Sequence, residues 1–401
     1  MEAPNLAMIP SGYKARVVYS IMPENGVGDF TFVRSGDATR INKDGLIETV
    51  DSHVPRLNYD LVNGVPSECP SLLLEPQSTN LLPQSNDYSD SVWLKQQAGI
   101  ASAPVVTSNY AISPDGTLNA DRVVFNLNGA TNSDFSQLAT SLTTSAGNIT
   151  NSVYIKSNTD SNYVMNFTKA SGANNLITVT NKWQRFEATL NNTSTSSAFR
   201  IRLRHTESTS NYADVSIFGA QLEQQSYATS YIPTSGSTVT RSAETCNSAG
   251  NASTFNSEQG ILFAEFSALA NDGTYRAIYI NDNAATRYVG LRYSNNANQI
   301  QAISFDGSNL GFIAHTLSNA TAFSKFAVKF GATGISLYID GSLIGSDATF
   351  TGIASNELDE LLFNSNSGTQ AFYGKCKDLR YYDTEGMTDT EINNLLTQLT
   401  Q

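Results

Sequence analysis

Short runs of alternating apolar and polar residues recur along almost the whole chain, and this pattern restricts the fold more than any other feature. In residues 199–204 the alternation is strict, because Phe199, Ile201 and Leu203 fall on one side and three arginines on the other. A period of two residues is that of a β-strand with one buried face. Comparable runs occur at 122–125, 152–156, 163–167, 176–179, 183–190, 215–220, 261–266, 277–280, 288–293, 325–330 and 335–339. The chain is therefore predicted to be all-β and to contain antiparallel sandwiches or jelly rolls.

Two local signals refine this prediction near the C-terminus. Asp340-Gly341 separates two strand-like runs, and Asp-Gly is a strong signal for a two-residue hairpin turn. One short helix is predicted at the end of the chain. Thr388 and Glu391 have the spacing of a capping box, and an apolar stripe follows at Ile392, Leu395, Leu396 and Leu399. We expect this helix to pack on a sandwich.

The length and the turn residues suggest how the chain is divided. A chain of 401 residues is long enough for two or three domains. Prolines cluster between residues 55 and 76, and proline cannot donate to a β-ladder. The first 78 residues are therefore expected to form an extended arm or a small β-layer that lies on something else, and a partner surface or a neighbouring subunit could cover it. The predicted units are the arm (1–78), a first sandwich (79–233), a small polar linker (234–254) and a second sandwich with the helix (255–401).

Charge and composition exclude several classes of function. The chain has 24 basic and 36 acidic residues, a net charge of −12, and no basic stripe, so we expect no nucleic-acid partner. Arg200, Arg202 and Arg204 share one strand face, which is either solvated or a site for an anionic ligand. No run of about 18 apolar residues occurs, so no membrane insertion is expected. The first residues lack the apolar core of a signal peptide, which indicates synthesis in a cytoplasm.

Three phrases of the sequence resemble known families. Residues 39–48, 54–57 and 71–81 resemble an N-terminal pattern of bacteriophage structural proteins, in which it precedes a carbohydrate-binding-module-like jelly roll. Residues 183–186, 218–223 and 227–234 are similar to parts of that jelly roll. Residues 255–401 resemble the concanavalin A-like or laminin-G-like sandwich through the hairpin phrase at 337–345. The resemblance implies a virion protein of the tail-fibre, head-fibre or receptor-binding type, and such proteins are commonly homotrimers.

No catalytic signature is apparent, and the sequence predicts a protein that is not an enzyme. The spacing Glu-x-Asp-x-x-Glu of the laminarinase branch is absent from residues 255–401, and no nucleophile elbow or phosphate-binding loop occurs. The three cysteines and three histidines show no zinc-ligand spacing. No cofactor is expected. A structural calcium ion, which is common in such modules, stays an alternative, with Asp87, Asp121 and Asp214 as candidate ligands.

Exposed aromatic side chains are the candidates for sugar binding, because they stack on the apolar face of a pyranose. Trp93, near Tyr88, is one candidate platform, with a rim or core position as the alternative. Trp183 begins an alternating strand and is expected in the core. In the second sandwich, Tyr279, Tyr288 and Tyr293 could project from one sheet.

Together these observations predict a virion appendage assembled in the host cytoplasm. Its arm would contact other virion proteins and its sandwiches would bind a host-surface polysaccharide multivalently, where avidity replaces single-site affinity. Two alternatives stay open, namely a capsid or tail decoration protein without a ligand and a polysaccharide depolymerase.

Overall fold

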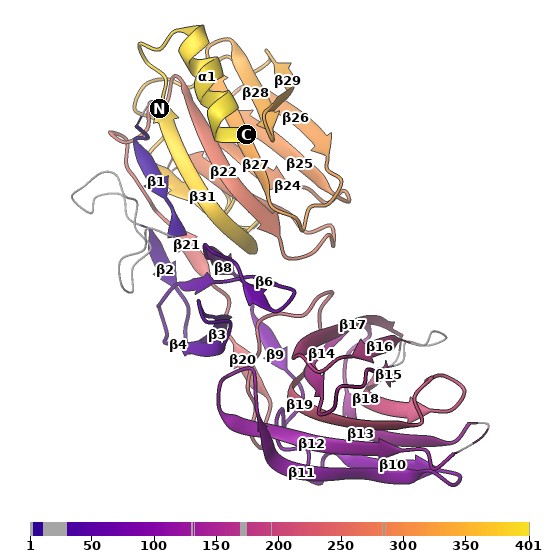
Figure 1. The fold of residues 1–401 in the computed structure, drawn as a ribbon. Helices are drawn as coiled ribbons and strands as arrows, with labels where there is room; N and C mark the ends of the chain where they lie inside the picture. The colour runs from indigo at the N-terminus through magenta and orange to yellow at the C-terminus, as the bar shows by residue number, and fades with distance from the viewer. Residues whose placement is uncertain are drawn as a thin grey trace.

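The computed structural model shows two β-sandwiches held apart by a narrow joint of paired strands (Figure 1). It describes residues 3–10, 30–129, 131, 133–168, 175–193, 195–282, 284 and 286–400. The predicted all-β class, with two antiparallel sandwiches and one C-terminal helix, is confirmed. Of the expected arm, residues 1–2 and 11–29 lie outside the described part.

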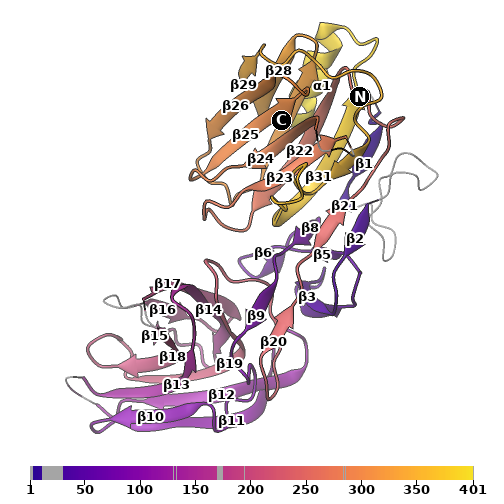
Figure 2. The same ribbon diagram turned by 180° about the vertical axis from the view of Figure 1, so that it is seen from behind.

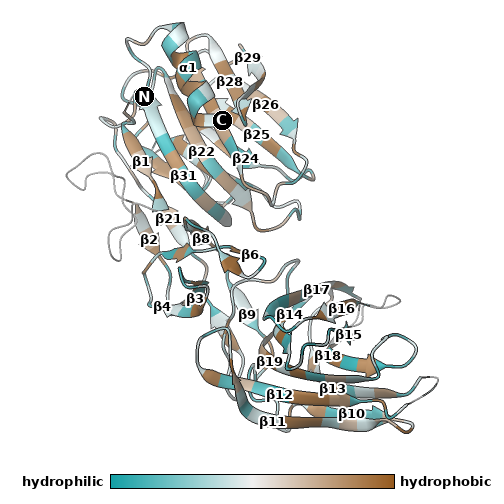
Figure 3. Ribbon diagram, viewed as in Figure 1, coloured by the Kyte–Doolittle hydropathy of each residue, from teal (hydrophilic) through white to brown (hydrophobic). Residues whose placement is uncertain are grey.

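The first sandwich contains two five-stranded antiparallel sheets. In spatial order, one sheet is β10 (Leu94–Ala98), β13 (Phe135–Thr143), β18 (Ser196–Arg204), β15 (Tyr163–Phe167) and β16 (Leu176–Val179). The other is β11 (Ser102–Ile112), β12 (Leu118–Asn126), β19 (Tyr212–Glu223), β14 (Gly147–Ser157) and β17 (Gln184–Asn192). The alternation along β18 puts Phe199, Ile201 and Leu203 between the sheets, all fully buried. Figure 3 shows the same alternation of brown and teal along many strands.

The second sandwich pairs an eight-stranded sheet with a five-stranded one. The larger sheet runs β29 (Ser342–Asp347), β28 (Gly334–Ile339), β27 (Ser324–Gly331), β22 (Gly260–Ala268), β31 (Gly374–Asp383), β8 (Ser71–Leu74) and β5 (Arg56–Asn58), with β1 (Leu6–Met8) also on β31. The smaller runs β26 (Leu310–Thr316), β25 (Gln299–Phe305), β24 (Tyr288–Tyr293), β23 (Arg276–Asn281) and β30 (Glu360–Leu362).

Both local predictions near the C-terminus are confirmed. Asp340 and Gly341 have φ of 43° and 84°, as a two-residue hairpin turn between β28 and β29 requires. Helix α1 (Asp389–Thr400) begins after the predicted capping box, with the Glu391 N–H donating to Thr388 Oγ1 at 3.3 Å. Its apolar stripe is buried against the outer face of the eight-stranded sheet.

Strands from the first 78 residues complete the second sandwich, although about 180 residues or more separate them in sequence from its strand β22. β8 pairs with β31 through Leu72 and Leu74, and β1 pairs with the same strand edge further along. Leu6, Met8, Leu72 and Leu74 are buried in the core of this sandwich. The segment expected as an arm or a β-layer lying on something else is thus covered, over its described residues, largely by its own chain.

The joint is made of strand pairs that link the arm to the segment between the sandwiches (Figure 2). Residues 234–254, expected as a free linker, carry two strands that pair with the arm, and Cys246 within them is fully buried. The pairs are β9 (Ser78–Asn80) with β20 (Val239–Arg241) and β2 (Thr31–Val33) with β21 (Thr245–Asn247). Two hairpins flank them, β3 (Ala38–Ile41) with β4 (Ile47–Val50) and β6 (Leu61–Val62) with β7 (Val65–Pro66).

No helix in the described part of the chain is long and apolar enough to cross a membrane.

Candidate functional site

Trp93, the predicted platform of the first sandwich, lies inside its core. Its ring is 1% exposed and packs between Tyr88, at 4.9 Å between ring centroids, and Phe199, at 5.4 Å. Its indole N–H donates to the carbonyl of Gln84 at 3.1 Å. The ring therefore offers no face to a sugar, and it occupies the core position that the sequence left as the alternative.

The three tyrosines predicted for the second sandwich do not share one face. Tyr288 and Tyr293 are five positions apart on β24, an odd number, so their side chains point to opposite sides of the sheet. Tyr293 is buried in the core beside Phe266, at 5.3 Å. Tyr279 lies on the outer face, stacked on Tyr288 at 5.1 Å, yet it is itself only 1% exposed. Of the three, only Tyr288 is partly open to solvent.

Tyr279 is covered because its ring lies over Gly290, the residue opposite it on β24. A Cβ atom on Gly290 would sit 1.9 Å from Tyr279 Cδ1, so only glycine fits beneath the ring. Because Tyr279 is packed in this way, its ring is not accessible to a ligand, although the sequence predicted it as a binding residue.

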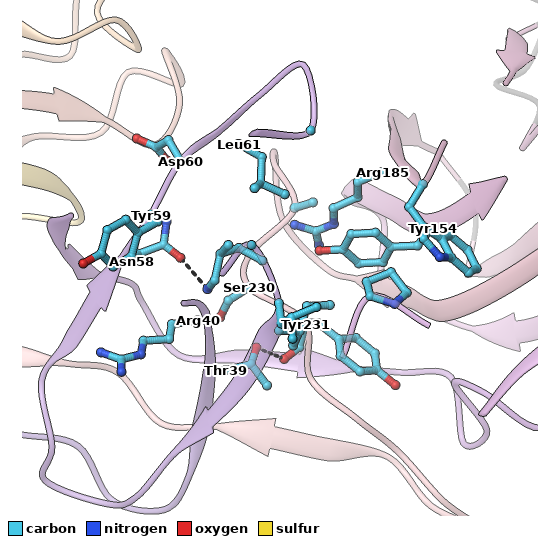
Figure 4. Close-up of a pocket in the computed structure, with 18 of the residues that line it drawn as sticks. Thr39, Arg40, Asn58, Tyr59, Asp60, Leu61, Tyr154, Arg185, Ser230 and Tyr231 are labelled. Carbon is cyan, nitrogen blue, oxygen red and sulfur yellow. Dashed lines mark hydrogen bonds between the residues drawn. The ribbon is translucent and has the colours of Figure 1, made fainter. Parts of the chain in front are cut away.

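A cleft of about 1230 Å³ opens where the joint meets the two sandwiches (Figure 4). Figure 4 shows Tyr59 and Asn58 on one side, Arg185 and Tyr154 on the other, and Ser230 between them. The second sandwich contributes Ser267, Ala268, Leu269, Thr321 and Lys375 to the lining. The cleft thus combines residues from all three parts of the chain.

Aromatic side chains form one wall of the cleft. Tyr154, Phe218 and Tyr231 are buried in a cluster on the outer face of the first sandwich. Trp183 packs against this cluster but stays half-buried, with its N–H donating to the Ile112 carbonyl at 3.1 Å. The prediction that Trp183 belongs to the sandwich core was wrong. It immediately precedes β17, an edge strand, and its indole lines the cleft.

Polar groups from the same wall are held in fixed positions. Arg185 donates to Ser152 Oγ at 3.0 Å and to the Thr229 carbonyl at 2.6 Å, and its guanidinium lies 5.5 Å from the Tyr154 ring centre. A stacked and hydrogen-bonded arginine loses little further freedom on binding a ligand. Lys182, which precedes Trp183, is exposed at the cleft.

The opposite wall is fixed by contacts within the arm and between the arm and both sandwiches. Thr39 donates its hydroxyl to the Tyr231 carbonyl at 2.5 Å, and Asn58 Oδ1 accepts the Ile41 N–H at 2.9 Å (Figure 4). Lys375 of the second sandwich forms an ion pair with Asp60. Each part of the chain is therefore tied to another beside the cleft.

A cluster of buried charges lies behind the cleft. We call it the charge cluster, and its members, all at most 3% exposed, are Arg34, Arg56, Glu75, Arg241 and Glu244. Glu244 accepts from Arg34 at 2.8 Å and from Arg56 Nε at 2.7 Å. Glu75 Oε2 lies 2.8 Å from Arg56 Nη2 and 2.7 Å from Arg241 Nη1. Buried charges persist only with such pairing, so the geometry of the joint is tightly specified.

The electrostatics of Glu75 follow from its partners. Burial raises the pKa of its carboxyl, but Arg241 and Arg56, with two hydrogen bonds from Ser230, outweigh burial and lower the pKa to about 2. Glu75 therefore stays ionised at neutral pH. It is a structural anion rather than a proton donor.

The acidic residues proposed for calcium serve other partners. Asp214 forms a two-pronged ion pair with Arg122, at 2.8 and 2.5 Å, and Asp121 accepts the N–H groups of Tyr88 and Asn109, both at 2.9 Å. Asp87 accepts the N–H of Ser89 at 3.0 Å. Over the residues that the structure describes, no group of three His, Cys, Asp or Glu side chains is placed to hold a metal ion.

The arginine row of β18 is largely paired within the first sandwich. Arg202 is 5% exposed and lies 2.5 Å from Glu207, which also contacts Arg204 at 3.3 Å. A solvated face was one of the two alternatives, but the middle arginine is buried. The turn after β18 places Glu207 beside Arg202 and Arg204. The alternating pattern within β18 could not predict this pairing, because Glu207 lies outside the strand.

Comparison with known proteins bears on the second sandwich. A family model described as the concanavalin A-like lectin/glucanases superfamily matches residues 247–393. This match agrees with the lectin-like fold expected for residues 255–401. No curated protein matches the chain.

Several solved structures are similar to part of the chain at low identity and low TM-score. The CBM40 module of the Ruminococcus gnavus IT-sialidase, bound to α2,3 sialyllactose, is 15% identical, with 39% of this chain and 94% of that chain covered and a TM-score of 0.31. Domain 4 of AbnA, a GH43 extracellular arabinanase from Geobacillus stearothermophilus in complex with arabinotriose, is 12% identical over 40% and 73% of the chains, with a TM-score of 0.32. A SAP-like pentraxin from Limulus polyphemus is 8% identical over 39% and 74%, with a TM-score of 0.30. These likenesses carry no inference about ligands.

Proposed function

We propose that this protein binds a saccharide chain in the cleft between its two sandwiches and does not cleave it. The observation that carries the proposal is the half-buried Trp183 indole, which lines the cleft beside the anchored Arg185. An indole stacks on the C–H face of a pyranose, and a guanidinium donates to its hydroxyl groups. A sugar ring needs both the stacking contact and the hydrogen bonds, because binding removes its C–H face and its hydroxyl groups from water.

The frame of the cleft suits a ligand that binds weakly at each sugar. The charge cluster, the ion pair of Asp60 with Lys375 and the bond from Thr39 to Tyr231 fix its walls before any ligand arrives. A preformed site loses little conformational entropy on binding, so more of the contact energy appears as affinity. The lectin/glucanase family match supports a saccharide as the ligand class, because residues 267–269, 321 and 375 of the matched region line the same cleft.

The carboxylates of the cleft support binding rather than hydrolysis. A glycosidase needs one carboxyl group that keeps its proton near neutral pH and a second that is ionised. The acidic side chains lining the cleft are Asp60, Glu75 and Glu187, and each forms an ion pair, with Lys375, with Arg56 and Arg241, and with Arg185, respectively. Arg241 and Arg56 lower the pKa of Glu75 to about 2, so this carboxyl is not suited to act as the acid.

We further propose that the protein is a bacteriophage virion appendage that displays this cleft to the host surface. The support is the resemblance of residues 39–48, 54–57, 71–81 and 227–234 to phage structural proteins. All four phrases meet in the joint, where they supply Thr39, Arg56, Glu75 and Ser230. Homotrimeric assembly, contacts of the arm with other virion proteins and location in the virion belong to the same proposal. A decoration protein without a ligand is the second candidate.

Binding of the full chain to a panel of bacterial surface polysaccharides, measured by calorimetry, tests the proposal. Trp183→Ala should weaken binding at least ten-fold, whereas Trp183→Phe should retain most of it. Tyr288→Ala, on the outer face of the second sandwich, is the matched control and should bind normally. Loss of binding in Tyr288→Ala alone would move the site to that face. Absence of binding by the folded protein would favour a decoration protein, and release of reducing ends would establish a depolymerase.

A further inference from the structure

Three branched aliphatic side chains face the cleft from separate elements although they are exposed to water. Leu46, between β3 and β4, is 38% exposed, Leu61 of β6 is 41% exposed, and Ile112 at the end of β11 is 61% exposed. Single exposed aliphatic residues are ordinary on protein surfaces. Three that line one cleft, two from the arm and one from the first sandwich, form a surface that a ligand can cover.

These side chains lie near one another in the lining of the same cleft, and we call them the aliphatic rim. The Cβ position of Gly45 lies 3.6 Å from Leu61 Cδ2, so Leu61 sits beside the residue preceding Leu46. The Cβ position of Gly116 lies 3.2 Å from Leu46 Cδ1, which brings Leu46 against the turn that connects β11 and β12. Ile112 starts that turn and is paired with Leu118, itself 61% exposed.

A saccharide that carries only hydroxyl groups gains little from such a strip, because its substituents prefer water. A methyl group removed from water gains about a four-fold factor in affinity. The polar wall with Arg185 and Lys182 lies in the same cleft and can hold the sugar hydroxyl groups while the rim covers its apolar substituents.

We propose that the saccharide bound in the cleft carries methyl groups, as acetyl substituents or as the terminal carbon of 6-deoxy sugars, and that the aliphatic rim recognises them. This inference rests on the proposed function and names the class of its ligand. Leu61 is placed to contribute most, because it lies above the space between Tyr59 and Arg185 (Figure 4).

Calorimetry with matched sugar pairs tests the inference on the full-length protein. One pair is an N-acetylglucosamine oligosaccharide against the glucose oligosaccharide of equal length, and the other is an L-fucoside against the L-galactoside. The unmodified protein should prefer the methyl-bearing member of at least one pair by about four-fold per methyl group buried. The pair that shows the preference identifies whether acetyl or 6-deoxy groups are recognised.

Leu61→Ser and Ile112→Ser should abolish this preference, because they weaken binding of the methyl-bearing sugar more than binding of the plain sugar. Leu310→Ser is the matched control, since Leu310 is 45% exposed on the second sandwich, away from the cleft lining, and should behave as the unmodified protein. Equal affinity for both members of each pair overturns the inference. If both members of a pair bind equally and Trp183→Ala abolishes their binding, the proposed function stands and only the inference fails. If no sugar binds, both the proposed function and the inference fail. Dimerisation that the two rim variants abolish would assign the strip to a second copy of the chain instead.

Discussion

Arg56 and Glu244 face each other across the joint as a two-pronged ion pair between residues 188 positions apart in the chain. Arg56 Nε donates to Glu244 Oε1 at 2.7 Å, and its Nη2 group contacts the second carboxylate oxygen. Both side chains are fully buried. This pair ties the arm, through β5, to the segment between the sandwiches, and so it helps to hold the walls of the cleft in place.

Breaking that pair should destabilise the joint strongly. We expect Arg56→Met to lower the free energy of unfolding by about 3–5 kcal/mol, because it leaves Glu244 and Glu75 buried with less positive charge around them. Arg40→Met is the control, because Arg40 pairs with Glu48 at 3.1 Å in a partly exposed position. Loss of this ion pair should lower the free energy of unfolding by less than about 1 kcal/mol, apart from any loss of side-chain packing. Urea unfolding measures both. Equal losses in the two variants would show that burial of the pair does not govern its strength.

The low pKa of Glu75 makes stability depend on pH in acid. Its ordinary pKa of 4.5 falls to about 2 in the folded protein, so the folded state binds this proton less readily than the unfolded state. The resulting stability, about 3 kcal/mol, is present above pH 4.5 and is lost as the pH falls towards 2. Unfolding midpoints at a series of pH values should therefore show a gap between the unmodified protein and Glu75→Gln that narrows through this window. A gap that is constant from pH 7 to pH 2.5 would contradict the assignment.

Calcium should not stabilise the first sandwich. The Lys95 ammonium donates to the carbonyls of Ser89 at 3.0 Å and Asp90 at 2.9 Å, and it lies close enough to Asp87 and Asp121 to interact with both charges. The Lys95 ammonium therefore already supplies the positive charge that a calcium ion would bring to these acidic groups. We expect the melting temperature to be the same in EDTA and in calcium, and Lys95→Met to cost about 1–2 kcal/mol. A clear rise in melting temperature on adding calcium to the unmodified protein would oppose this view.

The two tryptophans should respond differently to replacement. Trp93→Ala should cost about 3–5 kcal/mol, because it opens a cavity between Tyr88 and Phe199. Trp183→Ala should cost about 1 kcal/mol, because the indole is already half-exposed. Thermal unfolding of both variants without ligand makes the comparison. A large loss in Trp183→Ala would assign it a structural role and weaken its use as a binding probe.

Removing the arm should unfold the second sandwich. A fragment of residues 79–401 lacks Leu6, Met8, Leu72 and Leu74 of the core and leaves one edge of β31 unpaired. We expect this fragment to aggregate or to bind a hydrophobic dye, and co-expression of residues 1–78 to restore a soluble complex. A fragment that unfolds with the same midpoint as the full chain would show that the three added strands are dispensable.

Much of the fold could be predicted from the sequence because strands, turns and helix ends have characteristic patterns among residues that are close in sequence. The period of two along β18 and β27, the Asp340-Gly341 turn and the capping box at Thr388 involve residues that are neighbours in sequence. The candidate site left a weaker trace. Trp183, which immediately precedes β17, was recognisable as an aromatic residue of a strand-like run, but whether its ring would be covered depends on what packs there.

The sequence by itself determined the all-β class, the two sandwiches and the terminal helix, since each follows from patterns within about ten residues. Only the tertiary structure decided that the arm completes the second sandwich, that residues 234–254 are paired strands, and that the cleft lies between the three parts. These features depend on contacts between distant residues, such as Arg56 with Glu244 and Leu6 with Tyr381. Pairing of this kind is selected by the burial of whole surfaces and the neutralisation of buried charges, and neither leaves a periodic signal in the local sequence.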